Sequence, residues 1–302
     1  MKRSSQPIGI FDSGIGGLTV TREIAKRLPQ ESIVYLGDTL RCPYGPRPLQ
    51  EIRTFARQIA SWLYEQDVKL IVIACNSATA AGLEVVQQES PVPVIGVIEP
   101  GARAAVQATI SRRVGVIGTV ATIESDVYNR AIRSLDAGIT TFSTATPRFV
   151  EMVEQGLRLD RNPIEDIQAQ ASRVYIRPAF QEIARDYLNP LKRCNIDTLV
   201  LGCTHYPLLA PLISQVVGSD VRIISSAEET ARDVAEMLER RGQLASEGHE
   251  PVYRFATTSR DLDDYARLGS VILGRPVIDP AYVSLEELEE TLVDFEQKRM
   301  AS

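Results

Sequence analysis

Two apolar runs that each end in a cysteine constrain the fold of this chain more than any other feature. Residues 70–79 read LIVIACNSAT, and residues 197–207 read DTLVLGCTHYP. Short apolar runs rich in β-branched side chains are typical of buried parallel strands, and the polar residues after them indicate a strand-to-helix turn. Because open α/β sheets bind ligands at the carboxyl ends of their strands, Cys75 and Cys203 are both predicted at a binding edge. Their matching positions suggest that the two cysteines act as a pair.

The residues around the first run alternate between strand-like and helix-like patterns. Apolar residues recur at helical spacing from Leu49 to Leu63, and the triplet Glu99-Pro100-Gly101 is expected to break the pattern. A β-α-β-α order requires a parallel sheet with helices on both faces, so an α/β fold is predicted. Further strands are predicted from short apolar runs at residues 8–11, 32–37 and 93–97.

The second half of the chain repeats this order. The run at 8–11 is echoed at 114–117, Cys75 by Cys203, and residues 93–95 by residues 221–223. The spacing differs because the second half carries extra helical sequence between about residues 162 and 191. Two similar α/β lobes are therefore predicted. We expect residues 1–98 and 208–302 to form the first lobe and residues 99–207 to form the second.

The last part of the chain predicts one strand and three more helices, of which the middle one covers residues 261–268. The sequence favours an amphipathic helix over residues 227–241 and a strand over residues 252–256. Ser284 and Glu287 have the spacing of a capping box, which predicts the start of a final acidic helix.

Composition excludes several classes of function. The 302 residues carry a formal net charge of −6, and no basic stripe interleaved with aromatic residues indicates a nucleic-acid partner. No apolar stretch has the length of a membrane span, and the N-terminus lacks the hydrophobic region of a signal peptide. The four cysteines show no zinc spacing, and two histidines make a histidine-based metal centre improbable. A cytoplasmic protein with free thiols is expected.

Cys75 and Cys203 are the first candidates for chemistry. A cysteine at a helix N-terminus is stabilised as a thiolate, and such sites lower the thiol pKa to about 3.5–7.5. The alternative is structural, because cysteine often ends a strand as a small buried hydrophobe. Cys42 and Cys194 have no matching context, and we expect them to be incidental.

Two glycine-containing turns add polar groups at the predicted sheet edges. Residues 12–17 read DSGIGG, and Asp12 and Ser13 open this turn in the manner of an anion cradle. Residues 118–122 read GTVAT in the corresponding place of the second lobe, where Thr119 and Thr122 have hydroxyls that suit a carboxylate. The alternative for DSGIGG is a tight turn without a binding role, and the alternative for the two threonines is ordinary helix N-capping.

Other candidates lie in a loop, on a helix and beside the second cysteine. Tyr44 and Gly45 belong to a proline-rich loop, which either connects two elements or closes over a site. Glu154 is predicted on a helix that faces the second sheet, where most glutamates are solvated. His205 lies two residues after Cys203, and it either orients a group in the site or is a structural histidine.

Taken in order, DSGIGG, CPYG, ACNSAT, GTVAT, FVEMVEQG and GCTHYP resemble the glutamate racemases of the aspartate/glutamate racemase family. The likeness runs from about Ile8 to about Ala256. It implies two pseudo-twofold-related lobes with the site in the cleft between them, no cofactor, and one catalytic cysteine in each lobe. It also implies glutamate as the substrate, a homodimer, and D-glutamate supplied for peptidoglycan.

The resemblance also implies roles for individual residues. Cys75 and Cys203 correspond to the two acid/base residues, with Asp12 assisting near the first and His205 and Glu154 near the second. The substrate-binding residues that it implies are Asp12, Ser13, Tyr44, Gly45, Asn76, Ser77, Thr119, Thr122, Thr204 and His205.

The chain departs from the family pattern at two positions. Ser77 stands where threonine is usual and keeps the hydroxyl. Thr146 stands where many members have a cysteine.

Inversion at an α-carbon fits a pair of thiols, because one proton must leave one face while another arrives at the opposite face. Three alternatives remain at this stage. Aspartate racemase would share both cysteines. A cysteine hydrolase or amidase would use Cys203 as nucleophile and His205 as base. A two-lobed amino-acid-binding module would carry out no reaction.

Overall fold

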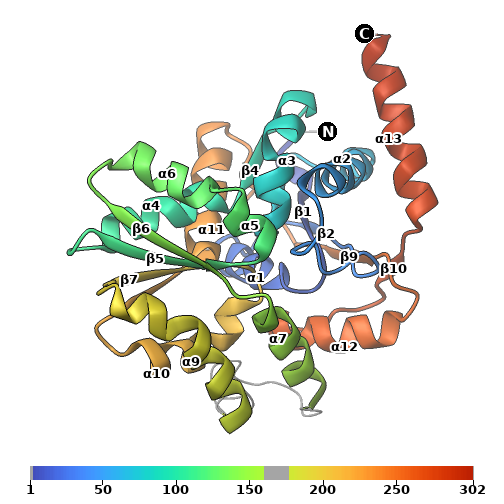
Figure 1. Ribbon diagram of the computed structural model, residues 1–302. Coiled ribbons are helices and arrows are strands. Elements are labelled where there is room, and N and C mark those ends of the chain that lie inside the picture. The colour runs from blue at the N-terminus through green and yellow to red at the C-terminus, as the bar shows by residue number, and fades with distance from the viewer. Residues whose placement is uncertain (1–2, 160–176, 302) are drawn as a thin grey trace.

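The computed structural model describes residues 3–159 and 177–301, which form two parallel β-sheets with helices packed around them. In Figure 1 the larger sheet lies towards the centre and right, and the smaller sheet lies at the left. Every strand pair in both sheets is parallel, which confirms the predicted α/β class. No helix in this part of the chain combines the length and apolar character needed to cross a bilayer.

The first sheet contains six strands in the order β10-β9-β2-β1-β3-β4. Strands β1, β2 and β3 are buried along their whole length, as expected for apolar strands covered on both faces. The strands are β1 (Ile8–Asp12), β2 (Ile33–Gly37), β3 (Leu70–Ile73), β4 (Val94–Gly96), β9 (Tyr253–Thr257) and β10 (Ala281–Tyr282).

The second sheet contains four strands in the order β6-β5-β7-β8, which is the order of β2-β1-β3-β4 in the first sheet. The predicted repeat is therefore present in the topology, since β5, β7 and β8 take the places of β1, β3 and β4. The strands are β5 (Arg113–Gly118), β6 (Thr140–Ala145), β7 (Thr198–Gly202) and β8 (Arg222–Ser225).

The helices cover both sheets, and α11 is one of those that join the lobes. α11 packs against both α1 and α4, and the ion pair between Arg103 and Asp233 joins α4 to α11. The described helices are η1 (Arg3–Ser5), α1 (Leu18–Arg27), α2 (Leu49–Glu65), α3 (Asn76–Glu89), α4 (Ile98–Ala108), α5 (Val120–Glu124), α6 (Val127–Leu135), α7 (Arg148–Leu159), α9 (Pro178–Arg193), η2 (Tyr206–Leu209), α10 (Ala210–Val217), α11 (Ser226–Arg240), α12 (Leu262–Leu273) and α13 (Leu285–Met300).

The last helix begins where the capping pattern places it. The Ser284 side chain accepts a hydrogen bond from the Glu287 amide, 3.0 Å away. α13 then runs along α2 at the outer edge of the molecule (Figure 1). The Trp62 indole donates to Glu287, and the Arg57 guanidinium pairs with Glu296.

Three features differ from the sequence-based expectations. α4 runs through Glu99-Pro100-Gly101, because Pro100 falls in the first turn, where a helix does not need the missing amide hydrogen. β6 was not predicted, because it is a polar edge strand with partly exposed side chains. The boundary at residue 208 is wrong for β8, which pairs with β7 in the second sheet. The other domain limits stay a prediction.

Part of the extra helical sequence predicted between residues 162 and 191 lies outside the described residues. The described part is α9, which contacts α10 and β6.

Candidate active site

The two sheets bring their carboxyl ends to one small cavity. In each sheet the strand order changes direction beside the central strand, between β1 and β3 and between β5 and β7, and such switch points are where α/β sheets bind ligands. Cys75 follows β3 and Cys203 follows β7, and both line this cavity. Its other lining residues are Ser13, Cys42, Pro43, Tyr44, Gly45, Asn76, Ser77, Thr119, Val150, Thr204 and His205.

Cys75 is the N-cap of α3, as the sequence predicted. Its Sγ accepts a hydrogen bond from the Ala78 amide at 3.4 Å and lies 3.6 Å from Ser13 Oγ. The thiol is 5% exposed. These contacts fix the sulfur at the end of β3, with a hydroxyl and an amide beside it.

Cys203 has a different setting from the predicted one. An irregular turn and the short η2 follow it, so it does not cap an α-helix. Its Sγ lies 3.8 Å from His205 Nδ1, which places an imidazole next to the second thiol. His205 is itself 2% exposed.

Burial overrides the expected lowering of both thiol pKa values. Loss of solvent raises the pKa of Cys75 to about 12, and the nearby Asp12 carboxylate adds to the rise. Burial also raises the pKa of Cys203, and Cys75 and Asp12 contribute in the same direction. Amide hydrogen bonds from Ala78 to the first sulfur and from His205 to the second oppose the rise without cancelling it. Burial therefore favours the protonated thiol at both sulfurs.

Asp12 joins two of the turns that border the cavity. Its carboxylate accepts the Gly14 amide at 3.1 Å and the Thr204 hydroxyl at 3.3 Å. The side chain is fully buried, and it is not among the residues that line the cavity. Asp12 thus connects the turn after β1 with the turn after β7.

The hydroxyls of Ser77, Thr119 and Thr122 form a chain across the cavity wall. Ser77 Oγ lies 2.8 Å from Thr119 Oγ1, which lies 3.1 Å from Thr122 Oγ1. Ser77 and Thr119 line the cavity, whereas Thr122 lies behind Thr119. Thr119 also caps α5, so the predicted capping role and a place in the site occur together.

The loop between β2 and α2 closes one side of the cavity. The Gly45 carbonyl accepts the Ala121 amide at 2.9 Å, which links the first lobe to the second. A Cβ atom on Gly45 would lie 2.7 Å from Thr119 Cβ, so only glycine permits this close approach.

The Tyr44 hydroxyl is occupied away from the predicted substrate site. It donates to the Asp38 carboxylate, which also pairs with Arg41 Nε at 2.6 Å and accepts from Thr258 Oγ1 at 2.8 Å. Asp38 is fully buried at the end of β2. Tyr44 therefore presents its ring to the cavity while its hydroxyl anchors the loop.

Two buried polar atoms at the cavity lack a hydrogen-bond partner within the described part of the chain. They are Asn76 Nδ2 and His205 Nε2. Buried donors without partners are costly, and a bound ligand is one way in which proteins satisfy them. Both atoms suit the oxygen atoms of a carboxylate.

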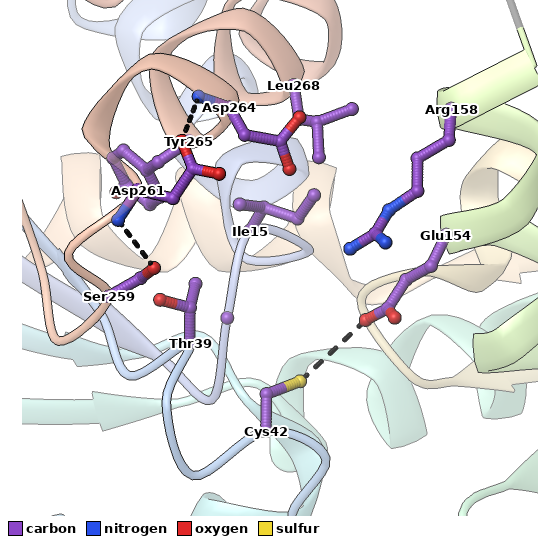
Figure 2. A pocket seen from close by; sticks show the side chains of 11 residues that line it. Ile15, Thr39, Cys42, Glu154, Arg158, Ser259, Asp261, Asp264, Tyr265 and Leu268 are labelled. Atoms are coloured by element: carbon purple, nitrogen blue, oxygen red, sulfur yellow. Dashed lines mark hydrogen bonds between the residues drawn. The ribbon is translucent and has the colours of Figure 1, made fainter.

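Glu154 and Cys42 lie between this cavity and a second pocket of about 280 Å³, which Figure 2 shows. Cys42 lines both spaces, and its Sγ lies 3.9 Å from Glu154 Oε1. Glu154 Oε1 is also 3.8 Å from His205 Nε2, a charge contact that is too long for a hydrogen bond. The predicted helical glutamate thus faces the site from its rim.

Sequence reasoning missed Cys42, which it treated as incidental. Its proline-rich loop carries no strand or helix pattern that would place it beside two other cysteines. Burial raises the pKa of Cys42, and the Glu154 and Asp12 carboxylates add to the rise. Cys194 does lie apart, with its Sγ against the Pro190 carbonyl.

The site offers proton transfer and anion recognition. Within residues 3–159 and 177–301, no group of three or more histidine, cysteine or acidic side chains has the arrangement of a metal site. The cavity instead combines two thiols from different lobes with amide, hydroxyl and imidazole groups. Such a set can bind carboxylates and move protons at an atom held between the sulfurs.

Comparison with known families agrees with this arrangement. The family model described as Asp/Glu/Hydantoin racemase matches residues 8–234. The chain belongs to the Asp/Glu/Hydantoin racemase family. It is therefore an isomerase of the racemase type, and the resemblance noted in the sequence is confirmed.

Individual racemases of this family are similar over nearly the whole chain. A glutamate racemase of Bacillus cereus is 41% identical over 94% of this chain and 98% of its own length. The crystal structure of a glutamate racemase isoform from Bacillus anthracis has a TM-score of 0.83 at 41% identity, covering 93% of this chain and 98% of that one. The glutamate racemase of Francisella tularensis in complex with D-glutamate has a TM-score of 0.82 at 33% identity, covering 94% and 99%.

Proposed function

We propose that this chain interconverts L-glutamate and D-glutamate without a cofactor, with Cys75 and Cys203 as the two bases. The observation that carries the proposal is that both thiols, one from each lobe, line a single small cavity. A base on one side of an α-carbon cannot return a proton to the other side without moving. Two sulfurs supplied from opposite walls avoid that movement.

The reaction needs one thiolate and one thiol in each direction. The thiolate takes the α-proton, and the bonding electrons pass towards the α-carboxylate. The other thiol then gives its proton to the opposite face and becomes a thiolate. Because burial raises the pKa of both sulfurs, the substrate ammonium group helps by favouring the thiolate beside it.

Three further residues are proposed to assist the thiols. Asp12 is assigned to Cys75, because its buried carboxylate contributes to the raised pKa of that thiol. His205 lies 3.8 Å from Cys203, and Glu154 lies 3.8 Å from His205. These distances support a role for the His205 imidazole in orienting Cys203 or exchanging a proton with it. The Glu154 carboxylate places a negative charge near that imidazole.

Substrate recognition is assigned to the polar groups of the cavity wall. Asn76 Nδ2 and His205 Nε2 have no other partner within the described chain and suit carboxylate oxygens. The remaining proposed contacts are Ser13, Tyr44 through its ring, Gly45, Ser77, Thr119 and Thr204, with Thr122 acting through Thr119 and Asp12 through Thr204. A pocket rich in such donors also stabilises the charge that develops on the α-carboxylate.

We further propose a cytoplasmic homodimer whose D-glutamate serves peptidoglycan synthesis. The resemblance to glutamate racemases over almost the whole chain supports this setting.

Hydrogen exchange tests the proposed reaction directly. The purified chain is incubated with L-glutamate in deuterated water, and the product is analysed by NMR and by chiral chromatography. We expect deuterium at the α-carbon and the appearance of D-glutamate. L-aspartate is assayed in parallel. Activity on aspartate alone would overturn the choice of substrate, and no exchange with either amino acid would overturn the proposed racemisation.

A further inference from the structure

We propose that Tyr128 is a positioning residue for substrate recognition, because its hydroxyl holds the Asn76 amide with the NH₂ group towards the cavity. This inference rests on the proposed function, in which Asn76 binds a substrate carboxylate. Tyr128 itself does not line the cavity, so its effect is exerted through Asn76.

The contact crosses from one lobe to the other. Tyr128 lies on α6, next to the second sheet, and Asn76 is the first residue of α3 in the first lobe. Tyr128 Oη donates to Asn76 Oδ1 at 2.7 Å. Both side chains are buried, at 2% and 3% exposure, so water does not compete for this bond.

The same phenol also bonds to a second hydroxyl, that of Ser226. Burial raises the pKa of Tyr128, and the side-chain hydrogen bond with Ser226 opposes that rise. Because the phenol donates its single hydrogen to Asn76 Oδ1, its oxygen is left to accept from Ser226. The amide must therefore turn its oxygen, and not its NH₂ group, towards Tyr128.

Two glycines hold the phenol ring in place. A Cβ atom on Gly101 would lie 3.3 Å from Tyr128 Oη and 3.1 Å from Ser226 Cβ. A Cβ atom on Gly202, the residue before Cys203, would lie 3.1 Å from Tyr128 Cε2. The ring thus fits against the strand that delivers the second thiol, and the hydroxyl has little freedom to move.

The orientation of the amide determines which of its groups faces the cavity. Asn76 Nδ2 is buried without an acceptor within the described chain, and Asn76 lines the cavity. An amide free to rotate would present oxygen or nitrogen to the cavity, and the oxygen would repel a carboxylate. Tyr128 keeps the donor in place before the substrate arrives, which is preorganisation of the binding group.

The substitution Tyr128→Phe tests this role, because it removes the hydroxyl and keeps the ring. We expect kcat/KM for glutamate to fall by about tenfold, the scale of one hydrogen bond to a charged group, mainly through a higher KM. Tyr64→Phe is the matched control. Tyr64 is a partly buried tyrosine on α2 that contacts Phe295, and its replacement should leave kcat/KM within about twofold.

A double-mutant cycle with Asn76→Ala separates positioning from general loss of stability. If Tyr128 acts through the amide, Tyr128→Phe lowers kcat/KM by less than about twofold once Asn76 is alanine. Equal losses in both backgrounds would overturn the inference, as would an unchanged kcat/KM in the single variant.

Two further measurements cover the remaining outcomes. If Tyr128→Phe does not fold, Ser226→Ala frees the phenol oxygen to accept from Asn76, and it should raise KM severalfold; an unchanged KM would overturn the inference. If the unmodified chain does not racemise glutamate, the proposed function fails on its own. Calorimetric binding of glutamate to the Tyr128→Phe chain then tests the inference, and affinity equal to that of the unmodified chain would overturn it.

Discussion

Cys75 and Cys203 line the same cavity but have different neighbours. Ser13 Oγ and the Ala78 amide contact the first sulfur, whereas the imidazole of His205 lies beside the second. The two sulfurs are therefore not equivalent before substrate binds. This asymmetry predicts that changing a neighbour of one thiol alters kcat and KM to different extents in the L-to-D and D-to-L directions. The ratio kcat/KM stays equal in the two directions, because the equilibrium constant between enantiomers is one.

Each thiol is expected to be indispensable. Replacing Cys75 or Cys203 by alanine removes one of the two proton-transfer groups, so racemisation should fall by at least about 10²–10⁴-fold in both directions. Chiral chromatography from pure L- and pure D-glutamate measures it. Cys194→Ala is the control, since that thiol contacts only the Pro190 carbonyl among the contacts described for it. Full turnover in either active-site variant would contradict the two-base mechanism.

The raised thiol pKa values also predict how activity depends on pH. With the pKa of Cys75 at about 12 and that of Cys203 raised as well, the thiolate fraction of the free enzyme is small near neutrality. It grows about tenfold per pH unit in this range, so kcat/KM should increase by about 100-fold between about pH 6.5 and about pH 8.5. A profile that falls over this range would show that thiolate formation does not limit the reaction.

Single residues also show what sequence reasoning can reach. Cys75, Asn76 and Cys203 directly follow strongly apolar strands, and that position alone brought them to one predicted edge. Cys42 and Tyr128 reach the site from an irregular loop and from a helix, where spacing along the chain contains no information about distance in space. Tertiary packing decides such positions.

The loop between β2 and α2 is held by a buried ion pair. Asp38 accepts from Arg41, Tyr44 and Thr258, and Arg41 also lies 3.9 Å above the Phe55 ring and donates to Gln58. Removing one partner of a buried pair leaves the other charge uncompensated. Loop position and stability should therefore change together.

Asp38→Asn is predicted to lower the free energy of unfolding by about 3–5 kcal/mol and to raise KM through displacement of Tyr44 and Gly45. Urea denaturation and steady-state kinetics measure the two effects. Glu236→Gln is the matched control, because its exposed pair with Arg240 is worth at most about 1 kcal/mol. Equal effects of the two substitutions would mean that the Asp38 cluster does not hold the loop.

Most elements were predictable from the sequence because their patterns were strong. The start of α13 at Ser284 follows from capping chemistry, and β1, β3, β5 and β7 follow from apolar runs. The polar edge strand β6 and the helix through Pro100 were not predictable, since pairing with β5 and position in the first turn outweigh local preference.

Buried thiols make the free energy of unfolding of the whole molecule depend on pH in the alkaline range. The pKa of Cys75 is about 12 in the folded chain against an ordinary value of 9.0, and burial raises the pKa of Cys203 and Cys42 in the same direction. Below about pH 9 these groups are protonated in both states, so their contribution is fully present. Above it the unfolded chain loses protons first, and stability falls by about 1.4 kcal/mol per pH unit for each thiol.

Urea unfolding at about pH 8 and at about pH 10 checks this prediction. The unmodified chain should lose stability over the interval, and the Cys75→Ala variant should lose less, because one titrating group is gone. The same loss in both chains would show that the Cys75 thiol does not contribute to the alkaline effect.

The cavity between the lobes has a volume of about 20 Å³, which is room for about one water molecule. Glutamate is larger than this space, so a bound substrate requires the walls of the cavity to move apart. The hydrogen bonds from Ala121 to Gly45 and from Tyr128 to Asn76 connect the two lobes beside the cavity, so they oppose this movement. The rate of this movement therefore sets an upper limit on kcat, however fast the proton transfers at the two sulfurs are.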